Sequence, residues 1–523
     1  KKLEINKRDK LIRAIPDTQS QVNRGQSCMK GKFGVNFVNS KKLIKTPMVR
    51  SEGKLKEVGW NEAISALAEK LNAYRNNNEY YLMLSSRSTN EEAFIAQKFG
   101  RSVMGTNNVN VSSNTRPELV EYLGQMLGNY AGTNSIWDLE KSQAFLVVSA
   151  NMTEQHNVAA LPIKQAVKNG SDLIVVDQRE TELTKIASIW LRPKPNTENV
   201  LIGSIIKVII DETLDDHEFI NDNTVDSEKM RKSVVSFDIV KAESITGISQ
   251  DEIRKTARII GKSKPFSTLY ALETLNTEVR ADCVKALINL SLATGNLGIV
   301  GGGLYPLLNG ANEQGAKDAG CMPDKLPGYI SLDDAARISA FEKIAGYSVP
   351  KTPGWSIDEM AGAVKSGRLK ALHVIGDSPS LVNGELSELV NSIDKLELLI
   401  VHASLENELT ANADIVFPAE TFAQSEGTYT NLERRVQILN PAISTTGYQT
   451  PSWSVLSQIA KELSVGGFEY QTSMQIFDEM RRQVEDYKGI SYEKLRSTTG
   501  VQWPCSYKES EGVSILHVAG KPD

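Results

Sequence analysis

An alternation of short apolar runs with helical stretches constrains the fold of this 523-residue chain more than any other feature. Residues 144–149 (AFLVVS) and 172–177 (DLIVVD) are nearly continuous apolar runs, and residues 163–168 between them belong to a helical stretch. Apolar runs of this length are typical of strands that are buried on both faces of a parallel sheet. The order strand, helix, strand therefore predicts a βαβ unit.

A second set of runs predicts another unit of the same kind. Residues 80–85 (YYLMLS) have the composition of a buried strand, and the pattern that follows predicts a helix over 90–103. Residues 371–375 (ALHVI) and 398–401 (LLIV) add two further strands. Proline and glycine within 326–331 (LPGYIS) mark a break between the units. We therefore predict the α/β class, with two α/β units and mostly parallel sheets.

Composition limits the partners and the compartment. The net charge of −5 does not favour a nucleic-acid partner, and no apolar run reaches the ~18 residues of a membrane span, so no direct membrane insertion is expected. Four scattered cysteines predict reduced thiols and a cytoplasmic location. The first residues include neither a starting Met nor the apolar core of a secretory signal, so we expect the chain to be part of a longer protein.

Nine sequence segments match segments of one known family and occur in the same order along the chain. They are RGQSCMKGKFG (24–34), SSRSTNEEAFIAQKFGRSVMGTNN (85–108), SANMTEQHNV (149–158), LIVVDQRETELTKIASIWLR (173–192), LATGNLGIVGGGLYPL (292–307), NEQGAKDAG (312–320), VIGDSP (374–379), ADIVFPAETFAQSEGTYTNLERRVQ (413–437) and VQWPC (501–505). Together they resemble the catalytic alpha subunits of formate dehydrogenases, in the molybdopterin oxidoreductase (DMSO reductase) superfamily. The resemblance covers nearly the whole chain.

The resemblance implies a domain organisation. Residues 1–45 would be an incomplete N-terminal iron–sulfur segment. Residues 46–110 together with 330–500 would form one α/β domain, and residues 111–329 a nucleotide-binding-like α/β domain. Residues 501–523 would be a C-terminal tail, and the β-barrel-like domain that closes the family's fold is expected to be absent.

Two residues near the start resemble the family's iron–sulfur site. Cys28 corresponds to the fourth ligand of a 4Fe–4S cluster whose first three cysteines would lie outside this sequence. Thiolates suit the iron of such a cluster, but a lone cysteine is also commonly a buried, inert thiol. Lys30 corresponds to a lysine between cluster and pterin, where a cation stabilises added electron density. The alternative for Lys30 is a solvated surface lysine.

Polar residues that follow two consecutive predicted strands form a second candidate site. They are Asn151, Thr153, Glu154, Asp177 and Arg179. Polar groups past the carboxyl ends of parallel strands line the crevice where α/β sheets bind nucleotides. The resemblance implies that these residues contact the guanine dinucleotide of the pterin cofactor, here as a vestigial site. The alternative is that they cap helices and stabilise turns.

The residues that the family uses for chemistry are replaced. An alignment without gaps places Arg116 at the metal ligand, Pro117 at the catalytic His and Leu308 at the Arg that holds formate. A guanidinium has no lone pair to give to a metal. We therefore expect molybdopterin to be absent and formate not to be oxidised. A one-residue shift would instead bring an oxygen ligand to the metal position, from Ser112, Ser113 or Thr115.

The resemblance then implies a function without formate chemistry. We expect a formate-dehydrogenase-like subunit of a multi-subunit redox complex, of the NADH dehydrogenase-like or electron-bifurcating NAD(P) transhydrogenase kind. It would act as a scaffold and iron–sulfur relay beside flavin- and iron–sulfur-containing partner subunits. One alternative is an active molybdenum or tungsten bis-pterin oxidoreductase with a substrate other than formate. Another is a structural subunit without a cofactor.

Overall fold

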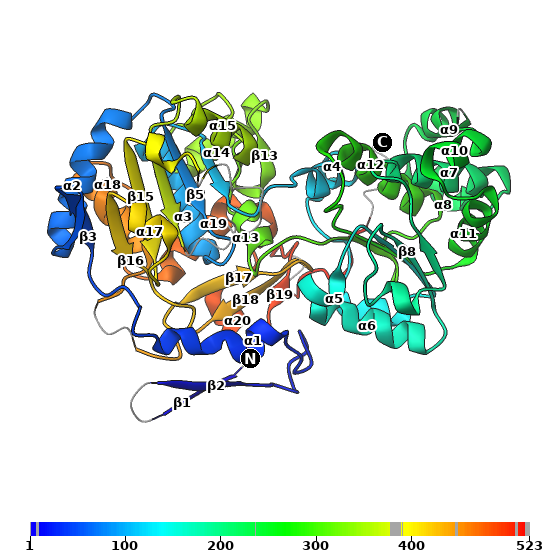
Figure 1. Cartoon of the computed structure of the whole chain (residues 1–523), viewed down its shortest axis with the longest axis horizontal. Helices are drawn as coiled ribbons and strands as arrows, with labels where there is room; N and C mark the ends of the chain where they lie inside the picture. The colour runs from blue at the N-terminus through cyan, green and yellow to red at the C-terminus, as the bar shows by residue number, and fades with distance from the viewer. Residues whose placement is uncertain are drawn as a thin grey trace. The chain divides into compact units, whose positions relative to one another are not determined.

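A computed structural model describes residues 2–6, 10–235, 237–376, 389, 391–444, 448–507 and 511–517. The end of the VIGDSP segment, residues 377–379, and parts of the segments 1–45 and 501–523 lie outside these described residues. The chain divides into two compact units, which are coloured by residue number in Figure 1. Unit 1 comprises Lys1–Thr115, Asn309–Asn431 and Arg435–Gly512, and unit 2 comprises Arg116–Leu308, Leu432–Arg434 and Val513–Asp523.

Unit 1 is built on a seven-stranded sheet. Its strands, in spatial order, are β4 (Lys54–Glu57), β3 (Met48–Ser51), β16 (Ile415–Pro418), β15 (Leu398–Ala403), β14 (Ala371–Ile375), β5 (Tyr80–Leu84) and β6 (Val109–Val111). The strands from β16 to β6 run parallel, and the β3–β4 hairpin joins one edge antiparallel. Every residue of β5, β14 and β15 is buried, as expected for strands covered on both faces.

A helix that follows β5 ends differently from the prediction. The α-helix α3 covers Asn90–Lys98 and continues as a π-helical turn over Phe99–Val103. This wider turn contains Arg101, whose buried guanidinium donates to the carbonyl oxygens of Gly320, Met322 and Lys325 at 2.7–2.9 Å. The sequence pattern cannot reveal these hydrogen bonds of Arg101, because the carbonyl groups belong to a segment that is distant along the chain.

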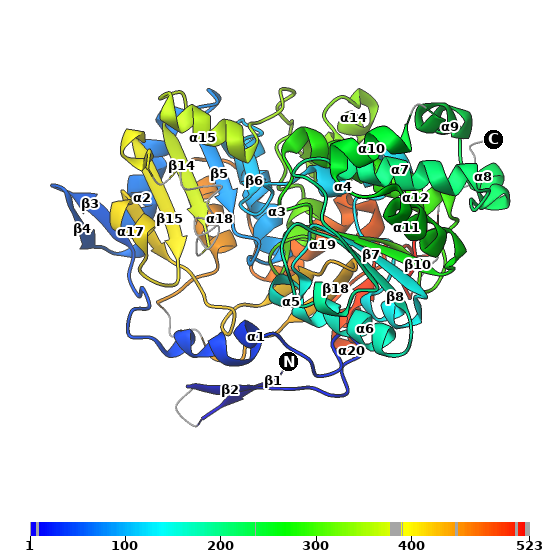
Figure 2. The ribbon, with the colours of Figure 1, turned by 45° about the vertical axis from the view of Figure 1, so that its right-hand side comes forward.

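Unit 2 is built on a five-stranded parallel sheet, which is visible from a second side in Figure 2. Its strands, in spatial order, are β11 (Gly303–Pro306), β10 (Phe266–Tyr270), β7 (Ala144–Val148), β8 (Asp172–Val176) and β9 (Ile189–Leu191). The helix α6 (Asn157–Lys168) connects β7 to β8, so the predicted βαβ unit is present. The predicted α/β class with mostly parallel sheets is confirmed.

Alternate residues of the unit 2 strands face two separate cores. Leu146, Val148 and Ile174 pack with α4 (Glu118–Leu127), α7 (Glu198–Asp211), α11 (Gln250–Lys262) and α12 (Thr277–Ala293). Phe145 and Leu173 instead pack with α6. Both faces of β7 and β8 are therefore apolar, whereas β10 carries the buried polar residues Ser267 and Thr268 within the strand.

The N-terminal segment belongs to unit 1 and has a small core of its own. Strands β1 (Lys2–Ile5) and β2 (Leu11–Ile15) form an antiparallel pair, and the short helix α1 (Met29–Phe33) and a 3₁₀ helix (Gly34–Asn39) follow. Leu11, Val35 and Val38 pack with Ala423. Within the described part of the chain, no helix combines the length and the apolar character that crossing a bilayer requires.

Two histidines at the centre of the unit 1 sheet hydrogen-bond to each other. His373 Nε2 lies 2.9 Å from His402 Nε2, and His373 Nδ1 lies 2.8 Å from the hydroxyl of Tyr80. Burial lowers the pKa of His402 to about 3, and burial together with the charge of His402 lowers the pKa of His373 well below its usual value. Both rings are therefore neutral in the folded chain.

The pH dependence of stability tests this arrangement. In the unfolded chain a His takes up a proton near its ordinary pKa of about 6.5, so unfolding gains protons below that pH and wild-type stability falls. His402→Phe removes one such site. The difference in unfolding free energy between wild type and variant should therefore shrink by roughly 2 to 3 kcal/mol from pH 7 to pH 4.5 in urea titrations.

The exposed His517 provides a matched control for this measurement. His517→Phe makes the same replacement at an exposed position, so it reports the effect of exchanging His for Phe at each pH. If the stability difference for His402→Phe did not change with pH, His402 would already be solvated in the native chain.

Candidate functional site

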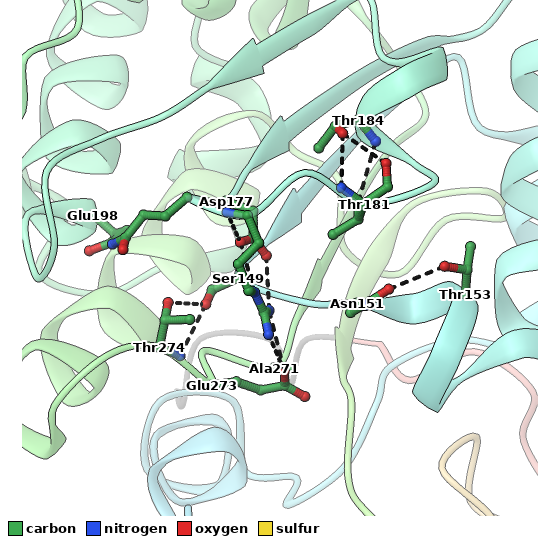
Figure 3. Close-up of polar contacts among 12 residues, drawn as sticks. Ser149, Asn151, Thr153, Asp177, Thr181, Thr184, Glu198, Ala271, Glu273 and Thr274 are labelled. Atoms are coloured by element: carbon green, nitrogen blue, oxygen red, sulfur yellow. Dashed lines mark hydrogen bonds and ion pairs between the residues drawn. The ribbon is translucent and has the colours of Figure 1, made fainter.

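Polar side chains gather at the carboxyl edge of the unit 2 sheet, as Figure 3 shows. Strands β7, β8 and β10 run parallel and end at this edge, and Ser149, Asp177 and Glu273 follow their last residues. Ser149 has a φ of +44°, and its hydroxyl lies 2.6 Å from the hydroxyl of Thr274. This is the edge at which parallel α/β sheets commonly bind ligands.

Asp177 and Arg179 contact one another and Glu273. Arg179 donates to Asp177 Oδ1 from its backbone nitrogen at 2.8 Å and from Nε at 3.1 Å, and to Oδ2 from Nη2 at 3.1 Å. Its Nη1 and Nη2 atoms both lie 3.3 Å from Glu273 Oε2. These hydrogen bonds, chiefly those with Asp177, raise the pKa of Arg179. The buried carboxylate of Asp177 is thus satisfied within the protein.

Arg116 extends the same set of charges. Its side chain is 7% exposed, and Nη1 donates to the carbonyl oxygen of Ala271 at 2.5 Å and lies 4.0 Å from Glu273 Oε1. Glu273 therefore lies between two guanidinium groups. We call Asp177, Arg179, Glu273 and Arg116 the charge chain.

His156 lies near Arg116. Its residue as a whole is half-buried, but Nε2 is enclosed and has no hydrogen-bond partner among the described residues. Burial, together with the charge of Arg116, lowers the pKa of His156 to about 4. The ring is therefore neutral at pH 7, and it does not add a charge to the edge of the sheet.

The residues after β7 form a smaller group. Thr153, in the short helix α5 (Met152–Gln155), donates to Asn151 Oδ1 at 3.1 Å, as Figure 3 shows. Glu154 is exposed and makes no ion pair or side-chain hydrogen bond with the described residues. The structure thus joins Asn151 to Thr153, and separately joins Asp177 to Arg179.

Glu273 and Glu198 were not singled out from the sequence. Glu273 follows the rule that located Asp177, because it comes shortly after β10, whereas Glu198 begins the helix seven residues after the end of β9. Gln178 donates to Glu198 Oε1 at 3.2 Å, and burial raises the pKa of Glu198. A systematic reading of every strand end, rather than of two strands, would have found Glu273 but not Glu198.

The three residues that we predict at the family's catalytic positions offer no metal ligand. Arg116 is a donor only, Pro117 precedes the helix α4 and has no side-chain donor atom, and Leu308 is buried in the apolar core of unit 2. Among the described residues, no group of three or more His, Cys, Asp or Glu side chains is placed to hold a metal ion. Arg116, Pro117 and Leu308 therefore supply no ligand to the metal of a molybdopterin cofactor.

The nucleotide end of such a cofactor fits no better at Asp177. Recognition of a ribose or a guanine edge by a carboxylate needs free acceptor positions. Both oxygens of Asp177 already accept from Arg179, and the side chain is fully buried. Within the charge chain, the enclosed Oε1 atom of Glu273 accepts no hydrogen bond from the described residues.

Cys28 differs from the other cysteines in its surroundings. It precedes α1 as the helix cap, is half-buried, and its sulfur accepts a hydrogen bond from the Gly31 amide at 3.3 Å. Burial raises the pKa of Cys283, and burial raises that of Cys321 to about 12, so both thiols remain protonated. Cys28 is partly accessible and its sulfur accepts from a backbone amide, as suits a sulfur that binds a metal. A 4Fe–4S cluster usually has four thiolate ligands, of which Cys28 would be one. Lys30 lies exposed on α1.

Comparisons with known proteins agree on one family. A family model described as molybdopterin oxidoreductase matches residues 44–462. The F420-dependent formate dehydrogenase subunit alpha of Methanocaldococcus jannaschii is 33% identical over 516 residues, which is 98% of this chain and 76% of that protein. The F420-dependent formate dehydrogenase 2 subunit alpha of Methanococcus maripaludis is 32% identical over 517 residues, with the same coverage of 98% and 76%.

One solved structure supports the fold alone. Acetylene hydratase from Pelobacter acetylenicus superposes with a TM-score of 0.72, at 17% sequence identity, over 96% of this chain and 72% of that chain. The arrangement of strands and helices is thus shared with a distant protein.

The charge chain makes a prediction about stability. Glu273→Gln preserves the shape of the side chain and removes the negative charge between Arg116 and Arg179. The buried guanidinium of Arg116 then lacks a counter-charge, so the free energy of unfolding should fall by about 1 to 3 kcal/mol in urea titrations. Arg116→Met in the Glu273→Gln background should recover part of the loss, because it removes the uncompensated cation.

Glu182→Gln is the matched control for this prediction. Glu182 pairs with Lys185 at 2.7 Å on the exposed surface of the same unit, and exposed pairs contribute little. If Glu273→Gln had as small an effect as Glu182→Gln, the charge chain would be screened by solvent and Arg116 would not depend on Glu273.

Proposed function

The chain belongs to the molybdopterin oxidoreductase family and is formate-dehydrogenase-like, and from this premise we propose that it is a non-catalytic subunit of a multi-subunit redox complex. In this proposal the chain is a scaffold and an iron–sulfur electron relay. Its pterin site is vestigial, and the chain does not itself oxidise formate.

The position of Arg116 carries the proposal. In an alignment without gaps this residue stands at the family's metal ligand, and its guanidinium can donate hydrogen bonds but cannot ligate a metal. Its buried side chain donates to the carbonyl oxygen of Ala271 and lies beside Glu273, so its role is structural. Pro117 and Leu308 are likewise unable to replace the His and the Arg that formate oxidation uses in the family.

The charge chain supports the same proposal from the nucleotide side. Asp177 and Arg179 are engaged with each other and with Glu273, whereas Asn151 and Thr153 hydrogen-bond to each other outside these ion pairs. We propose that these residues now stabilise the loops after β7 and β8. Their role in binding the cofactor has been replaced by contacts within the protein.

Cys28 supports the relay. We propose that it supplies one ligand of a 4Fe–4S cluster in the complete protein, with three further thiolates from residues outside this sequence. Such a cluster accepts and donates single electrons. The Gly31 amide that donates to the Cys28 sulfur would stabilise a reduced cluster, and the exposed cation of Lys30 would do the same from two residues away.

The names of the relatives support the presence of partner subunits. Both methanogen proteins are described as alpha subunits, and a subunit without its own chemistry needs a partner that supplies it. We propose flavin- and iron–sulfur-containing partner subunits that exchange electrons with NAD(P), in an NADH dehydrogenase-like or electron-bifurcating complex.

Metal analysis of the complete purified protein tests the proposed function. Iron without molybdenum or tungsten, together with no formate oxidation, is the expected result. Near-stoichiometric molybdenum or tungsten would contradict it and favour an active oxidoreductase that acts on another substrate. A protein without any of the three metals would favour the cofactor-free structural subunit.

Substitution of Cys28 tests the cluster ligand. Cys28→Ala should abolish the electron paramagnetic resonance signal of one reduced 4Fe–4S cluster and remove about four iron atoms per chain, because the cluster needs all its thiolates. Cys283→Ala is the control, since the Cys283 thiol lies in the apolar core of unit 2 and should not affect the signal. An unchanged spectrum in Cys28→Ala would show that Cys28 is not a ligand.

A further inference from the structure

A buried carboxylate in unit 1 is held by four hydrogen bonds from uncharged groups. Asp318 ends the short helix α13 (Glu313–Asp318) and is 1% exposed. Its Oδ1 accepts from Gln314 Nε2 at 2.8 Å and from the Tyr329 hydroxyl at 2.7 Å. Its Oδ2 accepts from the Tyr487 hydroxyl at 2.6 Å and from Trp503 Nε1 at 2.9 Å. These donors occupy the acceptor positions that a carboxylate offers.

The two oxygens of Asp318 differ in how their partners could respond to a proton. Protonation turns one acceptor position into a donor. The Tyr487 hydroxyl also lies 2.7 Å from Thr430 Oγ1, so it can rotate to accept from a protonated Oδ2 and to donate to Thr430 instead. The Tyr329 hydroxyl already accepts from Gln314 Nε2 at 2.9 Å and would have to accept a second time. A proton is therefore better placed on Oδ2.

Trp503 shares Oδ2 and cannot rearrange as Tyr487 can. An indole N–H is a donor only, and the Trp503 residue is 2% exposed. While Asp318 is charged, its bond with Trp503 is charge-assisted and roughly twice as strong as a neutral one. A proton on Oδ2 leaves Trp503 with a weaker bond to a neutral hydroxyl oxygen.

The strand that precedes Trp503 has few contacts of its own in the sheet. Strand β19 (Val501–Gln502) lies at the edge of a three-stranded sheet, after β17 (Gly427–Thr430) and β18 (Arg435–Leu439). It pairs with β18 antiparallel over two residues. So short a pairing is weak by itself, so the bond between Trp503 and Asp318 matters for the position of β19.

We propose that Asp318 is a proton-sensitive latch, whose charged carboxylate holds Trp503 and β19 in place and whose protonation loosens them. Burial raises the pKa of Asp318 to about 6, although its hydrogen bonds oppose the rise. The latch is therefore closed above this pH and opens as the pH falls through it. It works whether or not a cluster is bound at Cys28, so it is independent of the proposed function.

Glu91 is a second buried carboxylate close to this network. It accepts from the hydroxyls of Thr428 and Tyr492, and burial raises its pKa to about 7. The other ionisable side chains on α13 or on the described elements around it form no hydrogen bond or ion pair with Asp318. They are Glu92 and Lys98 on α3, Tyr429 on β17, Glu485 and Asp486 beside Tyr487, and Glu313 and Lys317 on α13.

Fluorine NMR of the whole chain labelled with 5-fluorotryptophan tests the latch, with Trp503→Phe to identify the Trp503 resonance. In the wild type this resonance should shift along one titration curve with a midpoint near pH 6, between about pH 8 and about pH 5. In Asp318→Asn it should not titrate, because the amide carries no charge. Asp333→Asn makes the same replacement at an exposed residue and should leave the curve unchanged.

Hydrogen exchange measures the loosening itself. The Cys505 amide donates to the carbonyl oxygen of Asp486 at 2.8 Å, so its protection reports whether the segment around Trp503 stays in place. After correction for the intrinsic pH dependence of exchange, protection in the wild type should be about fivefold lower at about pH 5 than at about pH 7.5. In Asp318→Asn the two values should be equal.

Two results would overturn the latch. One is a Trp503 resonance that stays fixed over this pH range in the wild type, which is decisive even if a variant does not fold. The other is a titration that persists in Asp318→Asn. If the curve also disappears in Glu91→Gln while Asp318→Asn retains it, the proton that moves Trp503 belongs to Glu91.

Discussion

Burial of both faces of two parallel sheets is the constraint on which the rest of the structure depends. In unit 2 the residues of β7 and β8 alternate between two apolar cores, so these two central strands have no face for polar groups. Functional side chains can then lie only where the strands end. The charge chain is located there for this reason, and its buried charges remain because they compensate one another.

The charge chain fills the carboxyl edge of the unit 2 sheet, where parallel α/β sheets commonly bind ligands. An edge that binds a ligand needs unsatisfied donors and acceptors, and here Arg179 satisfies Asp177 while Glu273 faces two guanidinium groups. A cation at position 116 would be costly to bury alone. Its pairing with Glu273 explains how the fold accommodates a buried arginine at this position.

The sequence was most informative where structure depends on local pattern. The runs at 144–149 and 172–177 correspond to β7 and β8 to within one residue, because short continuous apolar runs are typical of strands buried on both faces. Partners that come from distant segments were not predictable. The direction of Arg116 depends on Ala271 and Glu273, which are more than 150 residues away along the chain. Reading each strand end with the same rule would have added Glu273, but not its pairing.

The division of the chain has a consequence for the order in which the molecule forms during synthesis. All five strands of unit 2 lie between Ala144 and Pro306, so this sheet can close while later residues are still being made. In unit 1, Tyr80 of β5 pairs with Ala371 of β14, and β3 waits for β16. The half that emerges first is therefore completed last: β3 and β5 can pair early with β4 and β6, but they gain their second neighbours only after β16 and β14 have been made.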